Sequence, residues 1–264
     1  MCIRDRPKKE NVKSIPEIVF KTKPEWVKNS LANKSKYQEK YSQSIKNNDE
    51  FWRKEGKRIT WIKPYKKIKD VKFSSKEVKI NWFQDGTLNA SANCIDRHLK
   101  DKKDKTAIIW VGDNPKDTKK ISYKQLHNEV SKAANGLRKL GIKKGDRVTI
   151  YLTMIPELAV TMLACARIGA VHSIIFGGFS ADSISGRVND CDSHYIITAD
   201  EGVRGGKIIP LKAITDEALR KCPEVKKCIV VKRTGNKVDW VAGRDVWYDD
   251  LIRDVSNKCE PEEM

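Results

Sequence analysis

The fold of this chain is indicated most clearly by residues 164–212, which read ACARIGAVHSIIFGGFSADSISGRVNDCDSHYIITADEGVRGGKIIPLK. Two short apolar runs in this stretch have the composition of buried strands, and a glycine-bearing turn follows each. The first turn holds Phe176, Gly177 and Gly178, and the second holds residues 202–207. Loops that follow buried strands of an α/β sheet are a common place for phosphorylated ligands to bind. The stretch therefore predicts an α/β fold with a binding site at the strand ends.

Strands and helices alternate around this stretch. The spacing of Ser122 and Gln125 is that of a capping box, and it predicts a helix that ends at Gly141. Pro156 suits the first turn of a second helix, which ends near Gly169. The alternation predicts βαβ units with right-handed crossovers and a largely parallel, helix-flanked sheet. Short apolar runs typical of strands lie at residues 107–111, 148–152, 170–176, 195–198 and 228–231.

The leading part of the chain has a different composition. Residues 1–35 are polar and aperiodic, which predicts a disordered lead-in with at most a short helix near Trp26. Residues 1–6 match nothing else in the chain and read like a translated sequencing adapter, so they are set aside. From Tyr37 and Tyr41 onward, apolar residues recur every four positions, as on one face of a helix.

The net charge of +18 is distributed unevenly. Residues 1–80 hold 23 lysines and arginines against 10 acidic residues, whereas residues 81–264 hold 30 against 25. We interpret the excess as a lysine-rich solvated surface. A nucleic-acid-binding module in residues 1–80, in which aromatic rings stack on bases, is the alternative from another class. The aromatic residues there lie at helical spacing, which favours packing against a larger domain, and no nucleic-acid motif is present.

Other sequence features limit the class of protein. The longest uncharged apolar run, residues 158–166, is too short for a membrane helix, and no secretory signal is seen at the N-terminus. The seven cysteines are scattered without a CxxC pair, and the four histidines are equally dispersed, so free thiols are expected and a zinc site is not. A cytoplasmic protein that contacts no membrane is predicted.

The turn at residues 204–207, with the sequence RGGK, is the best candidate for chemistry. Two cations flank a sterically open backbone, so charge and amide donors could meet a phosphate together, although a solvated basic turn stays an alternative. His172 lies in an apolar run and is read as a core residue rather than a base. Asp200 and Glu201 are expected to cap a loop or to pair with Arg204.

Several long runs of this sequence closely resemble the acetyl-coenzyme A synthetase family, the AMP-forming acetate–CoA ligases of the adenylate-forming superfamily. The resemblance covers residues 36 to 264. It implies an N-terminal cap region at 36–95 and the first part of a large adenylation domain at 96–264. The runs that carry it are YSQSI at 41–45, FW at 51–52, WFQDGTLN at 82–89, NCIDRHL at 93–99, MLACARIGAVHSIIFGG at 162–178 and ADEGVRGGK at 199–207.

The resemblance also implies an activity. Acetate attacks the α-phosphorus of Mg-ATP to give acetyl-adenylate, and coenzyme A then takes the acetyl group. The substrates are small molecules, self-association of the full-length protein is left open, and propionyl-CoA synthetase is the alternative within the class. The ATP, Mg²⁺ and catalytic residues are expected beyond residue 264, so the chain alone is predicted to be inactive. The residues that the resemblance assigns to coenzyme A are Arg204, Gly205, Gly206, Lys207, Phe176, Gly177 and Gly178.

Overall fold

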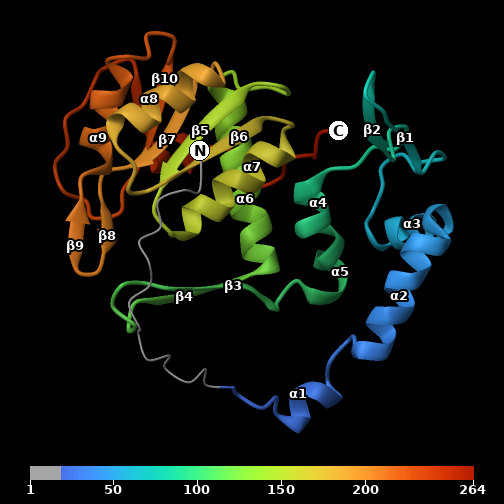
Figure 1. Ribbon diagram of the computed structural model, residues 1–264. Coiled ribbons are helices and arrows are strands. Elements are labelled where there is room, and N and C mark those ends of the chain that lie inside the picture. The colour runs from blue at the N-terminus through green and yellow to red at the C-terminus, as the bar shows by residue number, and fades with distance from the viewer. Residues whose placement is uncertain (1–18) are drawn as a thin grey trace, which may run out of the picture. The chain divides into compact units, whose positions relative to one another are not determined.

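The computed structural model describes residues 19–264 (Figure 1). It forms two compact units, of which the first ends at Glu55 and the second spans Gly56–Met264. The segment read as an adapter and residues 7–18 of the predicted lead-in lie outside the described residues. None of the helices within 19–264 has the length and apolar character that crossing a membrane requires.

The first unit is helical. It contains α1 (Pro24–Lys28), α2 (Lys34–Lys46) and α3 (Asn48–Glu55), which confirms the short helix expected near Trp26. The side chain of Asn33 caps α2 by accepting a 2.9 Å hydrogen bond from the amide of Lys36. Tyr37 and Tyr41 share one face of α2, as their spacing predicts, and their rings stack at 6.1 Å. Both rings are exposed on the helix.

The second unit begins with two antiparallel hairpins joined by short helical turns. One predicted strand has a different partner from the one expected: residues 107–111 lie in β3, which pairs with β4 rather than with the parallel strands. No strand was predicted at β4, because its first three residues are exposed and polar. The elements are η1 (Gly56–Arg58), β1 (Lys69–Phe73), β2 (Val78–Trp82), α4 (Ala90–Cys94), η2 (Asp96–His98), α5 (Leu99–Lys102), β3 (Thr106–Val111) and β4 (Thr118–Ser122).

The rest of the second unit is a five-stranded parallel sheet with the order β11-β10-β7-β5-β6, which confirms the predicted fold class. The capping box of Ser122 and Gln125 starts α6, and Pro156 starts α7, as predicted. The elements are α6 (Tyr123–Lys139), β5 (Arg147–Leu152), α7 (Pro156–Arg167), β6 (Val171–Phe176), α8 (Ala181–Asp190), β7 (Tyr195–Ala199), α9 (Leu211–Leu219), β10 (Lys227–Val231), β11 (Asp245–Trp247) and α10 (Tyr248–Arg253).

The strand order creates a switch point between β5 and β7, which are adjacent in the sheet. From β5 the chain passes through α7 to β6 on one side, whereas from β7 it passes through α9 to β10 on the other. Figure 1 shows α6 and α7 together and α8 and α9 together on the opposite face of the sheet. Ligands of open α/β sheets bind in the crevice at such a point, outside the carboxyl ends of the strands.

The core lies around the middle strands. Every residue of β7 is buried, as are the last five of β5, while β6 is an edge strand whose Val171 and Phe176 are each 54% exposed. One charged cluster is also buried: Lys212 of α9 is 0% exposed, and its Nζ lies 2.7 Å from a carboxylate oxygen of Asp216 and 2.9 Å from one of Asp245. This cluster connects α9 to the start of β11.

Candidate functional site

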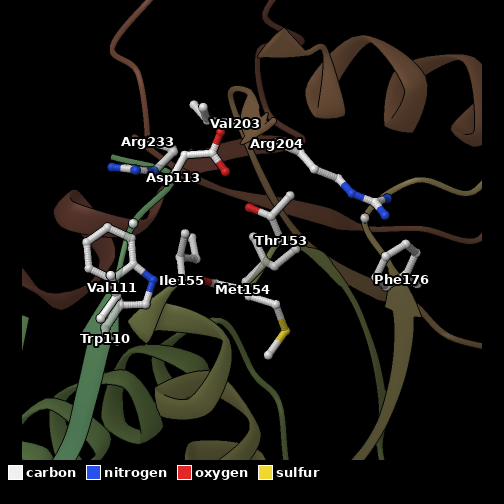
Figure 2. Close-up of a pocket in the computed structure, with 13 residues that line it drawn as sticks. Trp110, Val111, Asp113, Thr153, Met154, Ile155, Phe176, Val203, Arg204 and Arg233 are labelled. Atoms are coloured by element: carbon white, nitrogen blue, oxygen red, sulfur yellow. Dashed lines mark hydrogen bonds between the residues drawn. The ribbon is translucent and has the colours of Figure 1, made fainter. Parts of the chain in front are cut away.

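A cavity of about 370 Å³ lies at the switch point (Figure 2). Its walls come from the carboxyl ends of β5 and β6, the end of β3, the loop after β10 and a small hairpin that follows β7. That hairpin consists of β8 (Gly202–Arg204) and β9 (Lys207–Ile209). The crevice predicted by the topology is therefore a real hollow in the molecule.

The β8–β9 hairpin is turned by the glycines of the RGGK motif. Arg204 and Lys207 lie opposite each other in the ladder, and Gly205 and Gly206 between them have φ angles of +58° and +73°. Two consecutive positive φ angles are typical of a type I′ turn. Residues other than glycine, asparagine and aspartate rarely occupy its two central positions. A Cβ at either glycine would meet no atom within 4 Å, so the space above the turn is open.

Arg204 joins the two glycine-bearing turns. Its guanidinium carbon lies 5.2 Å from the centre of the Phe176 ring, which is a cation–π distance. One of its terminal nitrogens lies 3.7 Å from the position that a Cβ of Gly178 would take. Figure 2 shows Arg204 and Phe176 on the same side of the cavity. Neither Arg204 nor Lys207 forms an ion pair with any residue of the described chain, and Lys207 does not line this cavity.

Thr153 was missed by the sequence analysis. It follows β5 directly, and its methyl group lies where side chains at two glycines would be: a Cβ would come within 3.0 Å of that carbon at Gly177 and within 2.6 Å at Gly202. The loops after β5, β6 and β7 therefore approach so closely here that positions 177 and 202 have no room for a side chain. Its place directly after an apolar strand is the signal that could have found Thr153, because such positions border the crevice.

The β3–β4 hairpin supplies a wall that the sequence did not predict. The indole nitrogen of Trp110 donates a 2.7 Å hydrogen bond to the carbonyl oxygen of Met154. The guanidinium of Arg233, which follows β10, lies 5.1 Å from the Trp110 ring. A carboxylate oxygen of Asp113 accepts a 2.6 Å hydrogen bond from the amide of Gly206. These residues are far apart in the sequence, so no local pattern indicates that they meet.

Asp200 has a role other than pairing with Arg204. It is 1% exposed and accepts hydrogen bonds from the backbone amides of Arg233 and Gly235 at 2.8 and 2.7 Å. Of the two alternatives expected for Asp200, the structure shows the capping of a loop and not the pairing with Arg204, because the carboxylate accepts its hydrogen bonds from the loop after β10. His172 is half-buried in β6 outside the cavity, and burial lowers its pKa, which agrees with the reading as a core residue.

The cavity has an apolar floor and a charged rim. Trp110, Met154 and Phe176 supply apolar surface, while Arg204, Arg233 and Asp113 bring charges to the edge. This arrangement fits a ligand that has both apolar and charged parts. Within residues 19–264 no three His, Cys, Asp or Glu side chains are grouped so that they could hold a metal ion, so none of them is assigned to Mg²⁺.

Two family models match the chain. Residues 95–263 match the AMP-binding enzyme family, and residues 37–94 match the acetyl-coenzyme A synthetase N-terminus. Together they account for almost all of the described sequence.

Among known proteins, the chain is similar to acetyl-coenzyme A synthetases of Parvibaculum lavamentivorans (58% identical) and Shewanella baltica (56%). The matches cover 93% and 94% of this chain and 38% of each relative, so the chain spans well under half of their length. The structure resembles acetoacetyl-CoA synthetase from Streptomyces lividans with a TM-score of 0.76. That match has 23% sequence identity, covers 88% of this chain and 34% of the other, and shows the fold alone.

Proposed function

Because the chain belongs to the AMP-binding enzyme family, we propose that it is the N-terminal portion of an acetate–CoA ligase. In the proposed reaction, acetate and Mg-ATP give acetyl-adenylate and diphosphate, and the thiol of coenzyme A then takes the acetyl group and releases AMP. Residues 36–95 would form the cap region and residues 96–264 the first part of the adenylation domain. The support is the 55–58% identity to acetyl-coenzyme A synthetases along 93–94% of the chain.

The observation that carries this proposal is the cavity at the switch point, in which Arg204 lies over Phe176 beside an open glycine turn. We assign this cavity to coenzyme A. The stacked guanidinium is held by the ring face and keeps its N–H groups for phosphate oxygens. The open backbone at Gly205 and Gly206 allows an anion to approach closely.

Each part of coenzyme A has a matching surface in the proposal. The uncharged pantetheine arm would lie on the apolar floor formed by Trp110, Met154 and Phe176. The nucleotide phosphates would lie toward Arg204 and Lys207, which have no acidic partners among residues 19–264. The close fit of Gly177 and Gly178 around Thr153 and Arg204 keeps the loop that carries Phe176 near the cavity.

In the proposed mechanism the chain binds and orients, and other residues of the full-length protein perform the adenylation. When bound, Mg-ATP would supply the adenylyl group that acetate attacks. The residues of this chain align the thiol carrier and neutralise part of its charge, a contribution that comes from positioning. The proposed partners are the small-molecule substrates, and the proposed location is the cytoplasm.

Calorimetric titration of the full-length protein with coenzyme A tests the proposal. Changing both Arg204→Ala and Lys207→Ala removes two charge-assisted contacts and should weaken coenzyme A binding about 100-fold or more, because each is worth about 1.5–3 kcal/mol. The matched control is Lys221→Ala, which removes a lysine whose ion pair with Asp182 is exposed. Unchanged affinity in the double variant would refute the assignment. AMP formation that needs acetate, ATP and coenzyme A tests the reaction, and a preference for propionate would favour the alternative.

A further inference from the structure

We assign the β8–β9 turn to an anionic ligand, yet within this turn the backbone N–H of Gly206 already donates a hydrogen bond to the carboxylate of Asp113. Asp113 belongs to the exposed turn of the β3–β4 hairpin, and its Oδ2 lies 2.6 Å from the backbone nitrogen of Gly206. A hydrogen bond from a backbone N–H to a carboxylate is charge-assisted and stronger than a neutral one. The contact joins two hairpins that are separated by more than ninety residues in the sequence.

The Asp113 carboxylate bonds to a backbone amide rather than to a cationic side chain. Arg204 and Lys207 form no ion pair within residues 19–264 and lie on either side of the glycine turn, but the Asp113 carboxylate bonds to the amide between them. A phosphate bound at this turn would use the same N–H donor and carry the same kind of negatively charged oxygen. The carboxylate therefore takes the place that a ligand phosphate oxygen would take, while the neighbouring cations stay available.

We propose that Asp113 is a specificity-determining residue that competes with the phosphorylated ligand for the β8–β9 turn. The inference rests on the proposed function, because the ligand in question is coenzyme A. A weakly charged molecule cannot displace the carboxylate, whereas a ligand with several phosphate charges attracts Arg204 and Lys207 strongly enough to do so. Asp113 thus lowers by the same factor the affinity of each ligand that takes the amide of Gly206, and it does not change the affinity of a ligand that leaves this amide alone.

The geometry allows this displacement without unfolding. Asp113 is exposed, and the turn that carries it is closed by its own backbone hydrogen bonds, from Gly112 to the carbonyl of Asp117 at 2.7 Å and from Asp117 to that of Asn114 at 2.8 Å. A change of side-chain rotamer is enough to release the amide of Gly206. The space above the glycine turn is open, so an incoming phosphate meets no obstacle there.

A purely structural role for the same contact predicts the opposite change in coenzyme A affinity when the carboxylate is removed. If Asp113 holds the β8–β9 hairpin in its binding conformation, loss of the carboxylate weakens coenzyme A binding. If Asp113 competes, loss of the carboxylate strengthens it. The direction of one affinity change therefore decides between the two roles.

The test is calorimetric titration of the full-length protein and its Asp113→Asn and Asp113→Ala variants with coenzyme A and with pantetheine, which lacks phosphates. We expect the variants to bind coenzyme A about two- to fivefold more tightly, the range for one exposed electrostatic contact, and to bind pantetheine as the parent does. The gain should shrink at 1 M salt, where the screening length falls to about 3 Å.

Asp117→Asn is the matched control, because Asp117 lies on the same turn but faces Arg233 at 3.5 Å and not the glycine amide. Unchanged or weaker coenzyme A binding in both Asp113 variants overturns the inference, and so does an equal gain from Asp117→Asn. If Arg204→Ala still weakens binding in that case, the proposed function stands without the inference. If neither the parent nor any variant binds coenzyme A, both are overturned.

Discussion

Replacing Lys212 by methionine tests the buried charged cluster that connects α9 to β11. The ammonium nitrogen lies 2.7 Å from Asp216 and 2.9 Å from Asp245, and it donates a 3.0 Å hydrogen bond to the carbonyl of Asp239. Methionine has a similar length and fills the space without the charge. The change leaves the Asp245 side chain, which is 0% exposed, without one of its cationic partners.

The size of the expected stability loss depends on the contacts that Asp245 keeps in the variant. Removing one partner of a buried ion pair costs about 3–5 kcal/mol, because the other charge stays buried. Asp245 still accepts hydrogen bonds from Arg244 at 2.6 Å and from the amide of Val241 at 2.8 Å. We therefore expect a loss at the lower end, about 3 kcal/mol in the free energy of unfolding.

Equilibrium unfolding in urea measures this loss. With an m value of about 2 kcal/mol/M, the midpoint should fall by about 1.5 M. Lys221→Met is the matched control, since its ion pair with Asp182 joins the same two kinds of charged group but has side chains that are 64% and 80% exposed, so its unfolding midpoint should stay close to that of the parent. Equal midpoint shifts for the two variants would refute the argument that burial sets the cost.

Three further predictions concern packing, thiol reactivity and pH. Gly202→Ala brings a Cβ within 2.6 Å of the Thr153 methyl carbon and should destabilise the protein by about 1–3 kcal/mol, while adding Thr153→Ser, which removes that methyl, should restore most of the loss in a double-mutant cycle. Burial raises the pKa of the Cys165 thiol to about 12, so a thiol reagent at pH 8 should label the exposed Cys94 first; equal labelling of both in native protein, seen by mass spectrometry, would contradict this. Burial alone raises the pKa of Asp245, but hydrogen bonds from its cationic neighbours and an amide outweigh it and hold the pKa below 3.8. The ionised Asp245 carboxylate therefore stabilises the folded state above about pH 4, and this contribution is lost as the pH falls further. Between about pH 5 and pH 3 the unfolding midpoint should fall less in Asp245→Asn than in the parent.

The parallel sheet could be predicted because its signals are local. The capping box at Ser122, the proline at the start of α7 and the continuous apolar run of β7 each mark an element within a few residues. The same reasoning missed β4 and β11. The first three residues of β4 are exposed and polar, and β11 has only three residues, so neither shows the periodicity of a strand.

The candidate site could be predicted only in part for a similar reason. Arg204 and the glycines beside it were found because cations next to glycines indicate an anion site within a single turn. Asp113 and Arg233 were not found, because their importance comes from contacts across the fold, to Gly206 and to Trp110. The Asp200 carboxylate shows the same limit: the sequence suggested that it caps a loop or pairs with Arg204, but not that the amides it binds lie more than thirty residues later.

The order of the strands explains why Thr153 matters more than its sequence suggests. β6 and β7, which lead into the two glycine-bearing turns, are not neighbours, because β5 lies between them. The turns can approach each other only across the loop that follows β5, and Thr153 is the residue at which both make contact, through Gly177 and Gly202. A larger side chain at position 153 would push the two turns apart and widen the distance between Phe176 and Arg204. The cation–π contact that holds Arg204 toward the cavity therefore depends on a small residue at the end of β5.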